Sequence, residues 1–259
     1  MSKPVNKYLR RIENIGFFNF VRYLIHKNSG LPRTGEFKLY SKLVDSPLVC
    51  RAGTSDIDVF KHIFVLREYA AIGQLPDSGL IIDCGANVGF SAAYFLGVSP
   101  RVNVIAVEPD AGNFRMLALN TEAFGDRCTC VQAGVWSEPG GLRVVDAPQG
   151  DGREWARGVA VVPLGETADI QAVSIGMLLD QSPYDRVALL KVDIEGAELA
   201  VFGPGAERWL SRVDRIAIEL HGSACAETYL KAVAAAGFES TQAGGLTLSW
   251  RADRAGARP

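Results

Sequence analysis

Residues 80–97, LIIDCGANVGFSAAYFLG, carry the strongest fold signal of the chain. An apolar run at 80–85 is joined to a second one at 90–97 by a turn that contains Gly85 and Gly89. Glycine lets the backbone approach a ligand closely, and the N-terminus of the following helix opens towards that ligand. The stretch therefore predicts a strand, a ligand-binding turn and a helix.

Strand-like and helix-like stretches alternate after this unit. Further strands are predicted at 103–109, 128–135, 141–146, 158–164, 169–175, 187–194, 213–221 and 245–250. Further helices are predicted at 111–125, 196–211 and 224–238. Such alternation is typical of a parallel sheet covered by helices, so we expect an α/β fold.

The N-terminal residues predict a basic, aromatic-rich helix over 3–28. Its apolar side chains share one face at helical spacing: Phe17, Phe20, Val21 and Leu24. We expect this helix to pack on its own domain or on a second subunit of a homodimer. Adsorption to a membrane surface is the alternative, since Arg22, His26 and Lys27 could face lipid headgroups.

Residues 36–51 predict two short strands around an Asp-Ser-Pro turn at 45–47. A helix is predicted to begin at Ser55 or Asp56 and to end at Gly73. The expected domains are therefore an N-terminal extension at 1–50, a core domain at 51–250 and a flexible tail at 251–259.

The composition narrows the classes of partner. The 259 residues carry a formal net charge of −2 and no block of lysine and arginine, so we expect no nucleic-acid partner. No apolar run approaches the ~18 residues of a membrane span, and the charged N-terminus does not resemble a secretory signal. The five cysteines include no CxxC pair, and we expect free thiols in the cytoplasm.

The turn at 83–91 differs from a dinucleotide-binding turn. A G-x-G-x-x-G fingerprint beginning at Gly85 needs glycine at positions 87 and 90, where the chain has Asn87 and Phe90. Asp83 at the end of the strand suits a cationic ligand better than a pyrophosphate. At the end of the next predicted strand, Glu108 could accept hydrogen bonds from ribose hydroxyls.

We therefore expect a nucleoside-containing cofactor at the ends of these strands. Its expected contacts are Asp83, Gly85, Ala86, Asn87, Gly89, Ser91, Glu108, Asp110, Asn113, Gln132, Ala133 and Asp193. Simpler roles remain open for some of them: Asp83 and Asp110 could cap helices, and Glu108 could be a surface carboxylate.

The reaction is expected where the predicted strands 187–194 and 213–221 end. Asp193 and Glu195 follow the first strand, and His221 ends the second. We interpret these three residues as catalytic, with the imidazole as a general base. Asp193 and His221 with Glu219 also resemble a divalent-metal set, but we expect no metal ion. Lys191 is expected to have a structural partner, and Glu198 to lie at the surface or to cap a helix.

Four segments together resemble the FkbM family of methyltransferases. They are DCGANVGFS at 83–91, AVEPDAGNFRMLALN at 106–120, LLKVDIEGAE at 189–198 and IELH at 218–221. The resemblance, over roughly residues 50–240, implies a class I Rossmann-like fold with a seven-stranded, mostly parallel sheet and helices on both faces. It also implies S-adenosylmethionine as donor and, usually, transfer to a hydroxyl oxygen in polyketide or saccharide biosynthesis.

Two other functions are weighed against methyl transfer. A nicotinamide-dependent oxidoreductase is disfavoured by Asn87 and Phe90 and by the lack of a Tyr-x-x-x-Lys pair at Tyr184. A non-catalytic nucleoside-binding module would not need its acidic and histidine side chains. The acceptor stays open, including nitrogen in place of oxygen, and the polar segment 147–158 is a candidate lid over it.

Overall fold

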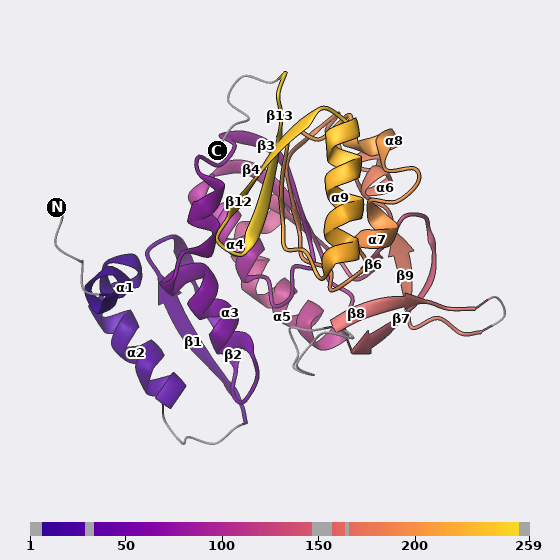
Figure 1. The fold of residues 1–259 in the computed structure, drawn as a ribbon. Coiled ribbons are helices and arrows are strands. Elements are labelled where there is room, and N and C mark those ends of the chain that lie inside the picture. Colours follow the sequence, from indigo (N-terminus) through magenta and orange to yellow (C-terminus); the bar gives the residue numbers. More distant parts are fainter. Residues whose placement is uncertain (1–6, 29–33, 147–156, 164–165, 254–259) are drawn as a thin grey trace.

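The computed structural model describes residues 7–28, 34–146, 157–163 and 166–253, which form a twisted central sheet between two groups of helices (Figure 1). The strands of this sheet are β3 (Ser78–Cys84), β4 (Arg101–Val107), β5 (Cys128–Val131), β10 (Val187–Val192), β11 (Arg215–Ile218), β12 (Phe238–Ala243) and β13 (Leu246–Arg251). Their order is β12-β13-β11-β10-β3-β4-β5. Neighbours from β5 to β11 are parallel, and β13 is antiparallel to β11 and to β12.

Numbered by their order along the chain, the seven strands lie in the sequence 3-2-1-4-5-7-6. This arrangement confirms the predicted class I fold, with its mostly parallel sheet of seven strands. The predicted strand at 245–250 is β13, whereas β12 was missed. Because most of its residues are exposed, β12 lacks the apolar run by which the other strands were found.

Helices cover both faces of the sheet, as predicted. One face carries α4 (Phe90–Val98), α5 (Ala111–Thr121) and a 3₁₀ turn (Glu122–Arg127). The other carries α6 (Ile175–Asp180), α7 (Glu198–Val201), α8 (Glu207–Leu210) and α9 (Ser223–Ala235). Ile81 joins the first core, and its neighbours Leu80 and Ile82 join the second. Strands buried on both faces explain the continuous apolar runs.

A second, smaller sheet lies beside the central one. Its strands are β6 (Gly134–Val135), β7 (Gly140–Asp146), β8 (Arg157–Val161) and β9 (Ile170–Val173), in the order β6-β9-β7-β8. In Figure 1 the β7–β8 pair projects from the core. Of the candidate lid at 147–158, residues 147–156 lie outside the described residues, as do residues 254–259 of the predicted tail.

The N-terminal extension differs from its prediction in two ways. The helix is broken at Gly16, where φ is +86°, into α1 (Lys7–Ile15) and α2 (Phe17–Asn28). The hairpin of β1 (Glu36–Ser41) and β2 (Val44–Arg51) turns at residues 42–43, so the predicted turn at 45–47 was wrong. Pro47 is tolerated inside β2 because a two-stranded sheet leaves one edge of each strand unpaired.

Two predicted helices are also less regular than expected. After α3 (Asp56–Phe60) the chain continues through a π-helical turn (Lys61–Val65) and a 3₁₀ turn (Glu68–Ile72). The predicted helix 196–211 is divided into α7 and α8, because a Gly-Pro-Gly sequence at 203–205 interrupts it. Among the described residues, no helix combines the length and apolar composition needed to cross a membrane.

The extension packs tightly on the core domain. Ile15, Phe20 and Tyr23 are buried in the same core as α4. At Gly97 in α4, a Cβ atom would lie 2.1 Å from the backbone oxygen of Leu43 in the β1–β2 turn. The helix and the hairpin can therefore approach this closely only with glycine at position 97.

We predict that Gly97→Ala lowers the free energy of unfolding by about 1–3 kcal/mol, because the added methyl group meets backbone that cannot move aside. Urea unfolding monitored by circular dichroism measures the change. Gly245→Ala is the matched control, since a Cβ atom there meets nothing within 4 Å. Equal stability of the two variants would show that the contact at Gly97 is looser than described.

Candidate functional site

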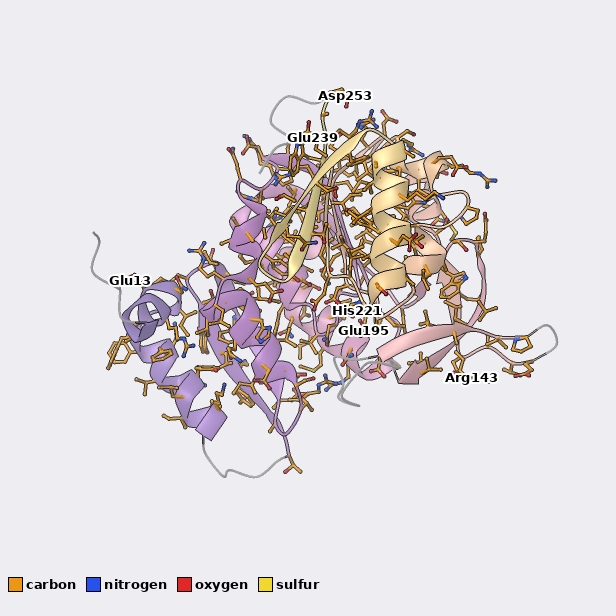
Figure 2. The ribbon with its side chains drawn as sticks, viewed as in Figure 1. Glu13, Arg143, Glu195, His221, Glu239 and Asp253 are labelled. Carbon is orange, nitrogen blue, oxygen red and sulfur yellow. The ribbon has the colours of Figure 1, made fainter. Side chains whose placement is uncertain are left out.

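The candidate site lies at the carboxyl ends of β3 and β10. The chain passes from β3 to β4 and β5 on one side of the sheet, and from β10 to β11 on the other. Ligands of open α/β sheets bind at such a reversal of strand order. Figure 2 shows the labelled His221 and Glu195 together at this edge, between the N-terminal extension and the β7–β8 pair.

Two adjoining clefts open at this edge. The first cleft runs along the end of β4, and the second faces the segment after α3. Four residues line both clefts: Gly85, Asn87, Asp193 and Glu195. The two clefts therefore meet at the turn after β3 and at the segment after β10.

The turn after β3 is fixed between its neighbouring strands. The backbone N–H of Gly85 and that of Ala86 both donate to the Val107 oxygen at the end of β4, at 3.0 and 2.9 Å. Gly85 has φ of +78°, and a Cβ atom there would lie 1.8 Å from the backbone oxygen of Asp193. Only glycine fits where this turn crosses the end of β10.

Glu108, at the end of β4, lines the first cleft and is 4% exposed. Its Oε2 accepts from the Asn87 N–H at 2.8 Å, and its Oε1 accepts from the Asp110 N–H at 3.0 Å and from Asn113 Nδ2 at 3.4 Å. Burial raises the pKa of Glu108 to about 7, although these hydrogen bonds oppose the rise. The predicted surface alternative for Glu108 does not fit this environment.

Asp110 and Asn113 continue the network. Asp110 caps α5 by accepting from the Asn113 N–H at 2.9 Å, which is the capping role left open by the sequence. Asn113 also accepts from Arg51 Nη2 at 2.7 Å, and Arg51 in turn forms an ion pair with Asp56 at 2.8 Å. Arg51 thereby links β2 to the first cleft. No sequence spacing connects it to Asn113, so the sequence analysis missed it.

Asp83 lies beneath the clefts. It is 0% exposed, accepts from Ser91 Oγ at 2.6 Å and pairs with Lys191 Nζ at 3.1 Å. Lys191 also donates to the backbone oxygen of Gly85 at 2.6 Å. Burial lowers the pKa of Lys191, but Asp83, Tyr69 and Asp193 outweigh burial and raise it well above its ordinary value. Lys191 thus has the structural partner expected of it.

The residues beside the first cleft are shifted from those expected after β5. Gln132 is exposed and Ala133 is buried in the core, and within the described chain neither lines a cleft. Gly134 and Val135 of β6 line the first cleft instead, together with Val159 of β8. The wall is therefore built where the chain leaves the central sheet for the smaller one.

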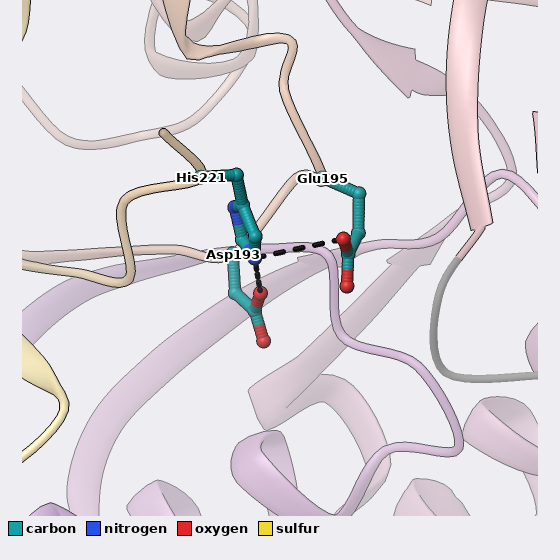
Figure 3. A group of neighbouring side chains, drawn as sticks. All are labelled: Asp193, Glu195 and His221. Carbon is teal, nitrogen blue, oxygen red and sulfur yellow. Dashed lines mark ion pairs between the residues drawn. The ribbon is translucent and has the colours of Figure 1, made fainter. Parts of the chain in front are cut away.

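The three predicted catalytic residues converge (Figure 3). His221 Nε2 lies 3.7 Å from Asp193 Oδ1 and 3.6 Å from Glu195 Oε2. Glu195 adopts a left-handed backbone, with φ of +52°, in the turn between β10 and α7. The site thus places one imidazole nitrogen beside two carboxylates that line both clefts, whereas His221 itself is not among the described lining residues of either cleft.

Glu198 is the residue that the sequence analysis placed wrongly. It is 0% exposed rather than at the surface, and its Oε1 lies 2.7 Å from His221 Nδ1. This contact directs Nε2 of the imidazole towards Asp193 and Glu195. Its Oε2 has no hydrogen-bond partner among the described residues. Its position three residues after Glu195 is the signal that could have revealed it.

Two side chains of this site, His221 and Glu195, have pKa values raised above their ordinary values. Burial lowers the pKa of His221, but the hydrogen bond with Glu198 and the charges of Asp193, Glu195 and Glu198 raise it to about 9. Burial and the neighbouring Asp193 raise the pKa of Glu195 to about 7, against the effect of His221. At neutral pH the imidazole is therefore largely protonated and balances the carboxylates around it.

The same group could coordinate a divalent cation. Within the described ranges, Asp193, Glu195 and His221 each offer one ligand atom, and these atoms lie within 4.8 Å of one another. The candidate metal site of the structure thus contains Glu195, where the sequence predicted Glu219. Glu219 lines the second cleft, and burial and Asp193 raise its pKa.

Comparison with known proteins matches residues 83–239 to a family model described as the methyltransferase FkbM domain. Methyltransferase 1 of Beauveria bassiana is 29% identical over 183 residues, covering 62% of this chain and 72% of the relative. Methyltransferase sdnD of Sordaria araneosa is 32% identical over 183 residues, covering 58% of this chain and 70% of that relative.

Two more distant similarities complete the comparison. The hexuronic acid methyltransferase AglP of Haloferax volcanii is 25% identical over 148 residues, covering 57% of this chain and 58% of the relative. Among solved structures, fibrillarin of Aeropyrum pernix with natively bound S-adenosyl-L-methionine gives a TM-score of 0.41 at 12% identity. That match covers 71% of this chain and 74% of fibrillarin.

We predict that Lys191→Met destabilises the protein by about 3–5 kcal/mol, because it leaves Asp83 buried without a counter-charge. Asp83→Leu should do the same by leaving Lys191 unpaired. The double variant should recover most of the loss, since it removes both charges. Urea unfolding of the three variants measures these differences, and additive losses in the double variant would contradict a coupled pair.

Proposed function

The chain belongs to the FkbM family of methyltransferases, and on this premise we propose that it methylates a hydroxyl oxygen of a small metabolite. S-adenosylmethionine, the donor of this family, supplies a methyl group on a positively charged sulfur. The observation that carries the proposal is the placement of His221 Nε2 beside Asp193 and Glu195, the two carboxylates that line both clefts.

The first cleft suits the donor. The wall of Gly134, Val135 and Val159 offers an apolar surface to a purine base. Glu108 Oε2 accepts one backbone N–H and has capacity for a ribose hydroxyl, whereas Oε1 already has two partners. Asp193 and Glu195 at the far end favour a cationic group. We propose that Gly85, Ala86, Asn87 and Gly89 shape this site through their backbone, and that Asp83 and Ser91 support it from beneath.

The second cleft is the proposed acceptor site. A hydroxyl group entering it would meet Asp193 and Glu195, which can accept its hydrogen bond and orient its oxygen. We propose that His221 Nε2 takes the hydroxyl proton during transfer. Glu198 is a positioning residue in this scheme, because it holds Nδ1 and keeps Nε2 aimed at the acceptor.

The proposed acceptor is a hydroxylated metabolite, such as a saccharide, a polyketide or another natural-product intermediate. The printed name of one relative, a hexuronic acid methyltransferase, supports a saccharide. Glu68 and Glu219 on the wall of the second cleft would repel a phosphate backbone, which disfavours nucleic acid. We also propose a cytoplasmic location, because all five cysteines are free thiols.

Neither alternative function gains support from the site. The family match argues for methyl transfer rather than hydride transfer to a nicotinamide. A non-catalytic binding module would have no use for the buried Glu198 beside His221, because burying a carboxylate costs stability. Binding and turnover measurements distinguish the three.

We predict that Glu108→Ala weakens binding of S-adenosylmethionine and S-adenosylhomocysteine by roughly ten- to a hundredfold, through loss of a charge-assisted hydrogen bond. Calorimetric titration measures both affinities, with NAD and NADP as ligands that should not bind. His221→Asn is the control variant and should bind the donor as the parent protein does. Nicotinamide binding would overturn the proposal.

We predict that turnover rises as the pH increases through the pKa of His221, about 9 in the free protein, because only neutral imidazole accepts a proton. His221→Asn should lower kcat by roughly 10²–10⁴ and remove this rise. Glu198→Gln removes a charge that raises the pKa of His221, so the rise should move to lower pH. Transfer of radiolabelled methyl to a screened acceptor measures each profile.

Two outcomes would contradict this mechanism. Full turnover of His221→Asn would mean that alignment alone drives transfer. Activity that is lost in EDTA and restored by Mg²⁺ would instead assign Asp193, Glu195 and His221 to a metal centre. Unchanged turnover in EDTA is the expected result.

A further inference from the structure

The outer face of α2 is apolar and exposed. Four side chains form this face, which we call the α2 face: Phe17, Phe18, Val21 and Ile25, exposed by 58%, 86%, 38% and 53%. Phe20 and Tyr23, on the opposite side of α2, are buried in the core. In Figure 1, α2 lies at the outside of the molecule, away from the central sheet. One side of α2 therefore packs in the core, and the other side is exposed.

Basic side chains accompany the α2 face. A groove of about 880 Å³ runs beside it, and Arg22, His26 and Tyr40 line this groove together with Phe18, Val21 and Ile25. The Arg22 guanidinium lies 5.2 Å from the centre of the Tyr40 ring beside this groove, whereas Lys27 Nζ lies 5.6 Å from the centre of the Tyr23 ring, on the buried side of α2. Neither α2 nor the described lining of the groove contains an acidic residue.

We propose that the α2 face binds the surface of an anionic phospholipid bilayer. The free energy falls when exposed phenylalanine and isoleucine side chains enter the boundary between headgroups and acyl chains. Arg22, which lines the groove beside this face, is attracted to anionic headgroups. A helix of twelve residues, lying in the plane of the membrane, supplies this contact without spanning it.

Charge favours a bilayer over a second copy of the chain. A symmetric dimer formed through the α2 face would bury the groove and its Arg22 against the same surface of the partner. The described residues of that surface offer no carboxylate to pair with the guanidinium, so burying this charge would oppose association. An anionic surface complements both the apolar and the basic side chains.

The test is flotation of the full chain with vesicles of phosphatidylcholine, with and without phosphatidylglycerol. We expect binding only when phosphatidylglycerol is present, and weaker binding at high salt. The double variant Phe18→Glu with Ile25→Glu should lower the partition coefficient by at least about tenfold. The control Leu199→Glu with Leu230→Glu changes two exposed leucines of α7 and α9 and should bind as the parent protein does.

Light scattering and circular dichroism complete the experiment. Melting of both double variants at the parent temperature would show that altered binding reflects the surface and not the fold. No flotation of the parent protein, or equal flotation with neutral vesicles, would overturn the proposal. A parent dimer that Phe18→Glu with Ile25→Glu converts to monomers, without any vesicle binding, would assign the α2 face to self-association. This test does not depend on methyl transfer.

Discussion

The ammonium group of Lys191 holds the two central strands of the sheet together at the point where the site forms. It pairs with Asp83 from β3, donates a hydrogen bond to the Gly85 carbonyl oxygen in the turn that follows, and lies 3.8 Å from Asp193 Oδ2 just after its own strand. Since the group is buried, these oxygen atoms replace the water it has lost. The turn of β3 and the segment after β10 are thereby fixed relative to each other, and every residue that lines both clefts belongs to one of them.

Charge at the site is arranged in two layers. Below the surface, Lys191 neutralises Asp83. At the surface, His221 lies among Asp193, Glu195 and Glu198, and these carboxylates raise the pKa of its imidazole. The lower layer maintains the shape of the turn, whereas the upper layer can change its protonation. The carboxylates that a cationic ligand would meet are therefore paired with an imidazole, which can lose its proton, and not with a permanent positive charge.

Local patterns were enough to predict six of the seven strands of the central sheet, all but β12, and several other differences arise from contacts between distant segments. Each strand and helix from β3 to β5 follows from an apolar run bounded by glycine or a polar turn. Glu198 could not be placed, because its burial depends on where β11 delivers His221. Arg51 reaches Asn113 only after β2 has packed beside α5. The turn at 42–43 packs against Gly97 of α4, a contact that the local sequence of the hairpin does not encode.

The two clefts share four lining residues, and this has a kinetic consequence. The shared residues are Gly85, Asn87, Asp193 and Glu195. A molecule that fills one cleft contacts residues that also line the other, so it changes the position and charge of side chains that the second molecule meets. Occupancy of the two clefts is then coupled in a steady-state scheme even if the backbone stays rigid. The common wall alone, without any lid or hinge, would then favour an order in which the two substrates bind. It would also make product inhibition depend on which cleft is occupied.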